Sequence, residues 1–409
     1  MNKSIIRSMV AAAIGCVGMS AVGGEGSVTP ELIGSHAPGT GIWSTFSVSV
    51  ERETVYTSWL NAGIDIFDVE QRSAPELITT LGVEVPGPYT LTWETDVYNS
   101  IAYSAVDGWG FQGIWIADVR DPSSPVSLGT FDMGGNRDMI AVGDTLYTRY
   151  SESAPMSTGS SLGFRMIDIS DRSAPSLIVD VESPGTMSGL DVFEGLVYIA
   201  DGELGLSIYD MSDPANPLVL GSYTSADFYA QDVVVELGLV YVTGGGELNV
   251  FDFLGGDLTP VLLGTFEYPN PAEITEVFGN ELAVVVDTAY VMNGKEELLV
   301  IDARDPSSLQ LAGSLVIEGG LVTDIAAKGF EVYLSDEVQG LLVVGVNECR
   351  ADLNEDGTLN FFDVSAFLEL FAAGDMTADF NGNPDGSPDG HLNIFDVSGF
   401  LALFSAGCP

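Results

Sequence analysis

Near the carboxyl end of the chain, the segment DLNEDGTLNFFD carries oxygen-bearing side chains at alternating positions. Calcium is a hard cation that takes about six to eight oxygen ligands, which a short loop supplies from alternating residues and from its last residue. These positions hold Asp352, Asn354, Asp356, Thr358, Asn360 and Asp363. Gly357 permits the sharp turn, and Thr358 offers its backbone carbonyl. The segment therefore predicts a calcium site.

A second segment of the same character, ADFNGNPDGSPDGHLNIFD, contains an insertion. Its candidate ligands are Asp379, Asn381, Asp385, Asp389, His391 (through its backbone carbonyl), Asn393 and Asp396. Counting back from Asp396 opens the loop at Asp385, whereas counting forward from the start opens it at Asp379. Asp389, Asn393 and Asp396 are ligands in both alternatives, and the choice between the two openings stays open.

Each loop is followed by the same apolar pattern, FFDVSAFLELF in one copy and IFDVSGFLALF in the other, with the spacing of a helix face. Two such loop–helix units with a final GCP resemble a dockerin of the GC type, over essentially all of residues 349–409. The resemblance implies a small calcium-dependent α-helical domain at residues 348–409 that attaches the chain to a protein partner.

In cellulosomal dockerins the two residues before the last calcium ligand help to choose the cohesin partner. Here these residues are Phe361 and Phe362 in the first unit and Ile394 and Phe395 in the second. They are apolar, rather than hydroxylic or basic as in that family. The resemblance thus implies a partner that is cohesin-like or a cell-surface protein of unknown identity; alternatively, the four residues pack the core of the domain.

The charge balance of the chain excludes several classes of partner. The 409 residues include 59 acidic and 13 basic side chains, which gives a formal net charge of −46. Such a surface repels nucleic acid and anionic lipid. It also stays soluble at high ionic strength, as expected of a protein from a saline habitat.

The first 24 residues have the features of a secretory signal peptide. MNKSIIR is a short basic start, and an apolar stretch ending in small residues follows it. No later segment is long and apolar enough to span a membrane. We therefore expect a secreted or extracellular protein, free or attached to the cell surface. Cys349 and Cys408 remain after signal removal, and an even count in an exported chain predicts one disulfide.

A unit with a period of about 45 residues recurs between residues 45 and 347. Its third apolar segment ends in Asp68, Asp118, Asp168, Asp210, Asp252 and Asp302, at spacings of 50, 50, 42, 42 and 50 residues, and Gly345 takes the seventh place. Four short β-rich segments per unit are typical of propeller blades. Strings such as LSIYDMSDPANP resemble the LVIVD-repeat family of β-propellers.

The seventh unit lacks a fourth strand, and TPELIGSH near the start of the chain has the pattern of one. We therefore predict an all-β propeller of seven four-stranded blades over residues 25–347, in which the amino-terminal strand closes the last blade. Closure removes the open strand edges that would invite aggregation.

Three sets of propeller residues are candidates for function. The repeated Asp residues at the ends of the third strands are expected to fix turns by accepting backbone N–H bonds. Acidic residues near the starts of inner strands are expected at the channel mouth, where they bind a cation or hold strand amides: Asp96, Asp138, Asp191, Asp232, Asp324 and Glu276. Residues expected on long loops either contact a glycan or protein ligand or cap the core: Trp109, Phe111, Tyr150, Tyr290 and Met292.

The sequence favours a non-catalytic binding or scaffold protein, with a recognition surface on the propeller and a calcium-dependent anchor at the tail. The alternative is a secreted polysaccharide-active enzyme with a catalytic propeller. The propeller region holds one His, His36, on the outer strand, no Cys and no nucleophile–base motif. This scarcity of catalytic groups favours binding over catalysis.

Overall fold

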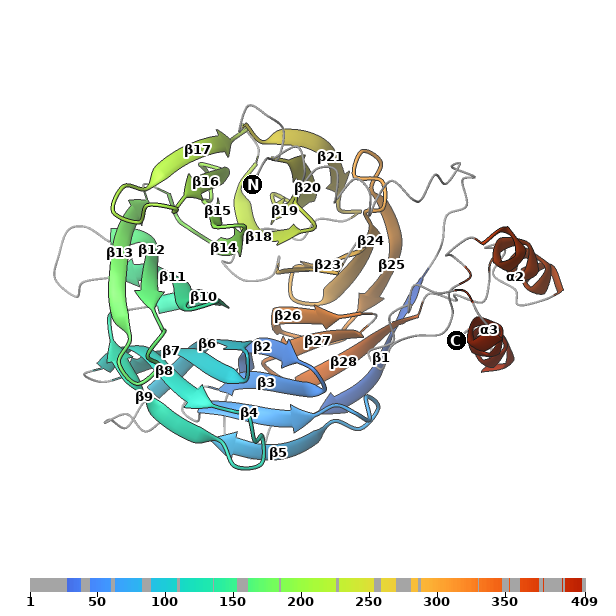
Figure 1. The fold of residues 1–409 in the computed structure, drawn as a ribbon, viewed down its shortest axis with the longest axis horizontal. Helices are drawn as coiled ribbons and strands as arrows, with labels where there is room; N and C mark the ends of the chain where they lie inside the picture. The colour runs from blue at the N-terminus through green and yellow to red at the C-terminus, as the bar shows by residue number, and fades with distance from the viewer. Residues whose placement is uncertain are drawn as a thin grey trace.

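The computed structural model is a ring of seven four-stranded antiparallel sheets, each of which is one blade of a propeller (Figure 1). Blades 1 to 6 follow one another along the chain, and blade 7 combines three strands from the end of the ring with the first strand of the chain. The described residues are 28–37, 45–59, 63–82, 90–108, 111–134, 136–152, 161–183, 185–225, 228–253, 259–269, 281–285, 288–329, 331–347, 353, 361–374, 378, 392 and 394–406.

The two inner positions of the blades lie closest to the ring centre. The innermost strands are β2 (Thr45–Glu51), β6 (Thr90–Tyr98), β10 (Asn136–Val142), β14 (Gly189–Phe193), β18 (Ala230–Glu236), β22 (Leu282–Val285) and β26 (Val322–Lys328). The second strands are β3 (Thr54–Trp59), β7 (Ile101–Gly108), β11 (Thr145–Glu152), β15 (Leu196–Ala200), β19 (Leu239–Gly244), β23 (Thr288–Asn293) and β27 (Glu331–Asp336).

The two outer positions complete each blade. The third strands are β4 (Gly63–Asp68), β8 (Phe111–Asp118), β12 (Ser161–Asp168), β16 (Leu206–Asp210), β20 (Glu247–Asp252), β24 (Glu297–Asp302) and β28 (Gly340–Asn347). The outermost strands are β5 (Glu76–Leu81), β9 (Val126–Asp132), β13 (Ser176–Ser183), β17 (Leu218–Tyr223), β21 (Val261–Glu267), β25 (Gln310–Val316) and β1 (Thr29–His36).

The hydrophobic core lies between neighbouring blades. Second strands are buried on both faces, and each one buries a Tyr: Tyr56, Tyr103, Tyr147, Tyr198, Tyr241, Tyr290 and Tyr333. The third strands are also apolar and buried on both faces, as in GIDIFD, because each blade is covered by a blade on either side. Outermost strands alternate exposed and half-buried residues, since one face meets solvent.

The amino-terminal strand closes the ring, as the sequence predicts. β1 pairs antiparallel with β28, from Thr29 opposite Asn347 to His36 opposite Leu341 (Figure 1). The closing strand also contacts the two neighbouring blades. Val28 donates its N–H to the Ala312 carbonyl of blade 6 (2.9 Å), and the His36 ring packs edge-on against Phe67 of blade 1, with ring centroids 5.0 Å apart.

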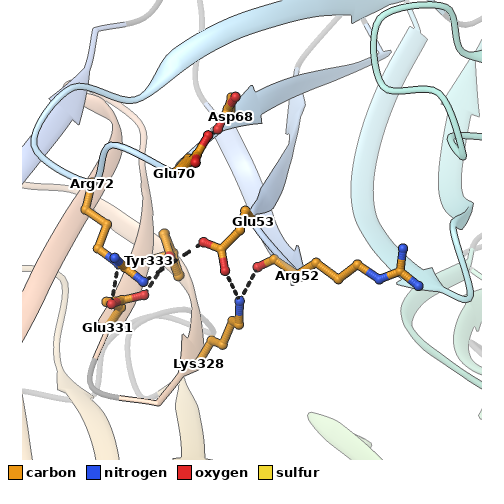
Figure 2. A network of polar contacts seen from close by, with 8 residues as sticks. All are labelled: Arg52, Glu53, Asp68, Glu70, Arg72, Lys328, Glu331 and Tyr333. Carbon is orange, nitrogen blue, oxygen red and sulfur yellow. Dashed lines mark hydrogen bonds and ion pairs between the residues drawn. The ribbon is translucent and has the colours of Figure 1, made fainter. Parts of the chain in front are cut away.

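A polar network reinforces the junction of blades 7 and 1 (Figure 2). Lys328 Nζ lies 2.8 Å from Glu53 Oε1, and Arg72 forms an ion pair with Glu331. Both pairs join one residue of blade 1 to one of blade 7. The hydroxyl of Tyr333 donates to Glu331 Oε2 (3.2 Å), so the glutamate has a partner in each blade.

Two helices follow the ring and lie outside it, α2 (Phe361–Ala373) and α3 (Ile394–Ala406) (Figure 1). They pack through the stacked rings of Phe367 and Phe400, whose centroids are 4.3 Å apart with 5° between the planes. Among the described residues, no helix combines the length and apolar character needed to cross a membrane.

Candidate functional site: an acidic cavity at the ring centre

The inner strands of all seven blades line one cavity of about 520 Å³. Seven of its lining residues are acidic: Glu94, Asp96, Asp138, Asp191, Asp232, Glu281 and Asp324. Of the described lining residues, Arg149 alone is basic. We call these seven acids the channel carboxylates. The sequence predicts five of them at this place, and the sixth predicted acid, Glu276, lies outside the described residues.

Five of the channel carboxylates hold neighbouring blades together. Each Asp accepts, through Oδ2, a backbone N–H from the innermost strand of the next blade around the ring. The bonds are Asp96 from Ala141 (2.8 Å), Asp138 from Leu190 (3.0 Å), Asp191 from Val235 (2.6 Å), Asp232 from Leu282 (2.9 Å) and Asp324 from Val48 (2.7 Å). At the junction of blades 1 and 2 the acceptor is Ser47 Oγ, which accepts a hydrogen bond from the N–H of Thr95 (3.0 Å). The structural role that the sequence suggests for these Asp residues is confirmed.

Sequence reasoning missed Glu94, Glu281 and Arg149. Neither glutamate side chain forms a hydrogen bond or ion pair with the described part of the chain, so neither links neighbouring blades. Arg149 donates to the Met187 carbonyl (3.2 Å), and its Nε lies 4.0 Å from Asp138 Oδ2. The sequence signals for the two glutamates are an acidic residue two places before Asp96 and another just before β22. Neither signal recurs in the other blades.

Burial and mutual repulsion raise the pKa of the channel carboxylates. Burial raises the pKa of Asp96 and that of Asp191 to about 6, against backbone hydrogen bonds that lower both. Burial, followed by the charges of Asp324 and Asp138, raises the pKa of Glu281 to about 8. The pKa of Asp324 also rises to about 8, mainly through burial. The cavity therefore holds several carboxylates that change protonation between about pH 5 and 9.

Burial also raises the pKa of the remaining channel carboxylates. For Glu94 and Asp232 the pKa lies well above its usual range, because nearby carboxylates add their repulsion to the effect of burial. The pKa of Asp138 rises less, because Arg149 stabilises its charged form. The cavity thus concentrates carboxyl groups, several of which are largely protonated at neutral pH, and Arg149 is their one basic neighbour among the described lining residues.

The repeated Asp residues of the third strands fix turns, as predicted, and take no part in the cavity. Oδ1 accepts the N–H two residues ahead in five copies: Asp68, Asp118, Asp168, Asp210 and Asp302, at 2.8–3.1 Å. Arg120 and Arg304 also pair with Asp118 and Asp302 in these turns. These arginines therefore serve the outer part of the blades.

Of the two alternatives for the five large residues expected on long loops, a ligand surface or burial against the core, three residues follow the second. Tyr150, Tyr290 and Met292 belong to the second strands β11 and β23 and are 0–4 % exposed, because these strands run further than the sequence suggests. Phe111 begins β8 and packs partly buried against the core of blades 1 and 2. Trp109 lies outside the described residues.

The predicted calcium and disulfide residues are described only in part. Asp363 and Asp396 are fully buried at equivalent places in the first turns of α2 and α3. The other candidate ligands, Asp352, Asn354, Asp356, Thr358, Asn360, Asp379, Asn381, Asp385, Asp389, His391 and Asn393, lie outside the described residues, as do Cys349 and Cys408. Within the described residues no group of three His, Cys, Asp or Glu side chains is arranged to hold a metal ion.

The apolar residues expected to contact a partner are largely at the surface. Phe361 is 76 % exposed, Phe362 67 % and Ile394 68 %, so these three do not pack the core of the helix pair. The core is formed instead by Phe367 and Phe400 with their apolar neighbours. The side chain of Phe395 is outside the described set.

Comparisons with known proteins agree with this architecture. The model of the LVIVD repeat matches residues 161–183, 184–225 and 279–316, which fall on blades 3, 4 and 6. No curated protein matches the sequence. The designed protein Ika8 resembles the structure with a TM-score of 0.55 at 10 % identity, covering 77 % of this chain and 98 % of that one. Sqt1 of Saccharomyces cerevisiae does so with a TM-score of 0.50 at 10 % identity, covering 76 % and 83 % respectively. At this identity the likeness shows the fold alone: the chain is a seven-bladed β-propeller that carries LVIVD repeats.

Proposed function

We propose that the chain is an exported, non-catalytic binding protein, in which the propeller presents a recognition surface and the tail is a calcium-dependent, dockerin-like anchor. In this proposal residues 1–24 are a signal peptide, residues 25–347 form the propeller and residues 348–409 form the anchor. The partner of the anchor is a cohesin-like or cell-surface protein, and the ligand of the propeller lies at the acidic cavity.

One observation carries the anchor part of the proposal: the two helices are equivalent halves of one small unit. Phe367 and Phe400 stack at its centre, and Asp363 and Asp396 are buried at matching places. A buried carboxylate costs free energy unless a cation or hydrogen bonds compensate it, and calcium loops end in such a carboxylate. These two residues are the last ligands of the loops that the sequence predicts.

The exposed residues Phe361, Phe362 and Ile394 supply the apolar part of a partner surface. Large apolar side chains exposed together on a small unit mark interaction sites more often than singly scattered ones do. Aromatic residues also dominate the energetics of protein interfaces. The two helix starts therefore offer two similar docking surfaces to one partner.

Attachment of the whole secreted chain to the envelope of the producing cell tests this proposal. We expect binding in calcium, release in chelator, and loss of binding in the variant Phe361→Ser/Phe362→Ser/Ile394→Ser. A matched control is Leu177→Ser/Ile178→Ser, which removes exposed apolar residues from the outermost strand β13. Binding that is unaffected by both chelator and the triple substitution would refute the anchor.

A further inference from the structure

The acidic cavity is too large and too dispersed for one metal ion. A volume of about 520 Å³ is in the range of small-molecule sites, which is about 300–1,000 Å³. The channel carboxylates come from six blades, and within the described residues no three acidic, His or Cys side chains meet at a metal position. The cavity therefore suits an extended ligand that meets several carboxylates at once.

The carboxyl groups of the cavity favour a cationic ligand, because a bound cation stabilises their ionised form. Seven carboxylates face one basic residue, Arg149, which is already engaged with the Met187 carbonyl. Five of the Asp residues accept a backbone amide of the next blade through one oxygen, and Asp191, Asp232 and Asp324 accept the amide of the following residue through the other. Each oxygen still has a lone pair left for a ligand. The side-chain carboxylates of Glu94 and Glu281 make no hydrogen bond or ion pair with the described residues, so both are available to a ligand.

A second, independent feature points to a hydrogen-bond donor in the cavity. Gln231 lines the cavity and is only 8 % exposed, yet its Oε1 atom has no hydrogen-bond partner among the described residues. A buried amide oxygen without a partner is destabilising, because it has lost the hydrogen bonds that water gave it. An ammonium group is a strong donor with three N–H bonds and would satisfy this oxygen.

Two aromatic rings at the cavity wall favour an organic cation over an inorganic one. Phe46 and Trp93 both line the cavity, and their ring centroids lie 5.1 Å apart. Aromatic faces attract ammonium groups and also contact the methylene groups between them. A strongly hydrated metal ion gains neither of these contacts.

We propose that the central cavity binds a small linear polyamine, with protonated amines at Glu94, Glu281 and Gln231 and the alkyl chain along Phe46 and Trp93. This inference rests on the proposed recognition role of the propeller and gives that role a ligand class. It is independent of the anchor, because no residue of α2 or α3 lines the cavity.

Calorimetric titration of the secreted chain with spermidine, at physiological salt and in chelator, tests the proposal. We expect one saturable site whose dissociation constant rises at least tenfold in the variant Glu94→Gln/Glu281→Gln. Glu76→Gln/Glu182→Gln is the matched control, because it removes the same charge from exposed positions on the outermost strands β5 and β13. Equal weakening by both variants would show unspecific attraction to the acidic surface and overturn the proposal.

The pH dependence separates the cavity from ordinary surface acids. The groups that face the ligand are the seven channel carboxylates and Arg149. Burial raises the pKa of these acids, so the free cavity takes up protons as the pH falls from 8 to 5.5. The affinity for the cationic ligand should therefore weaken severalfold over this range. Surface carboxylates have a pKa near about 4 and stay ionised over this range. A pH-independent affinity would contradict the proposal.

Two further measurements, of fluorescence and of magnesium binding, complete the test. Spermidine should change the fluorescence of the chain, and Trp93→Phe should remove most of that change. In a separate titration without chelator, saturable binding of magnesium that excludes spermidine would assign the cavity to a metal instead. If spermidine does not bind while calcium-dependent attachment persists, the polyamine inference is wrong and the anchor stands.

Discussion

Lys328 Nζ of blade 7 lies 2.8 Å from Glu53 Oε1 of blade 1, across the junction at which the ring closes. The same ammonium group also donates to the carbonyl of Arg52. Both side chains of the ion pair are partly exposed, so solvent screens their attraction. The ion pair therefore helps to fix the relative orientation of blades 7 and 1. Most of the stabilisation of this junction comes from the apolar packing of β1, β28 and blade 1.

A double-mutant cycle on this pair should give a small coupling free energy. For Lys328→Met and Glu53→Gln we expect about 0.2–1 kcal/mol of coupling in urea unfolding at low salt, reduced at high salt by screening. A coupling several times larger, or one that salt does not change, would contradict the view of a solvent-screened pair.

Deleting residues 25–36 should open the ring. The deletion removes β1, so the edge of β28 would present unpaired N–H and C=O groups to other molecules. We expect association in analytical ultracentrifugation and a lower melting temperature than that of the chain starting at residue 25. A deleted chain that is monomeric and melts unchanged would show that β1 is dispensable.

The stability of the propeller should fall as the pH rises through the neutral range. Burial and neighbouring charges raise the pKa of Glu281 to about 8, whereas an unfolded Glu titrates near about 4.3. The folded chain thus binds more protons between these values, and the free energy of unfolding decreases with rising pH. Urea denaturation from pH 4 to pH 9 measures this slope.

The variant Glu281→Gln should remove part of that slope. It should be more stable than the wild type at pH 9 by on the order of 1 kcal/mol, with a difference that vanishes near pH 4. Glu76→Gln, at an exposed position, serves as the control and should show no such pH-dependent gain. A Glu281→Gln protein less stable than the wild type at pH 9 would mean that this carboxylate is favourably paired.

The tail should bind about two calcium ions. Without the ion, the acidic residues of each loop repel one another, so binding is coupled to ordering of the loop. Asp363→Ala should abolish one site and Asp396→Ala the other in calorimetry of the chain starting at residue 25, with a weaker second site if its insertion distorts the coordination. Unchanged stoichiometry in both variants would refute the assignment.

Cys349 and Cys408 should form a disulfide that closes the tail. In the chain-entropy model a bridge over a loop of this size contributes on the order of 4 kcal/mol, less any strain. Labelling of the native, unreduced chain starting at residue 25 should therefore detect no reactive thiol, and reduction should reveal two. Labelling of two thiols before reduction would exclude the bridge.

The ring could be predicted from sequence because its signals repeat. Asp68 and its counterparts mark the end of each third strand, and the absence of a fourth strand after Gly345 identifies the closing role of residues 29–36. The sequence suggests loops at Tyr150 and Tyr290, whereas both residues lie on strands. The length of these strands depends on burial between blades, which no local sequence pattern shows.

The central cavity was predicted only in part, for a related reason. The inner-strand Asp residues recur from blade to blade and were therefore recognised. Glu94, Glu281 and Arg149 occur once each, and only closure of the ring brings them to one place. The proximity of such single residues is a property of the tertiary structure.

The position of β28 has a mechanical consequence for an anchored propeller. This strand is the last element of the ring before the tail, and it pairs with β27 on one edge and with β1 on the other. Under the proposed anchoring by the tail, a pulling force would reach the ring at Asn347, the last residue of β28. Because β28 is hydrogen-bonded along both edges, detaching it from the ring would require breaking two ladders, so β1 also strengthens the connection between ring and tail.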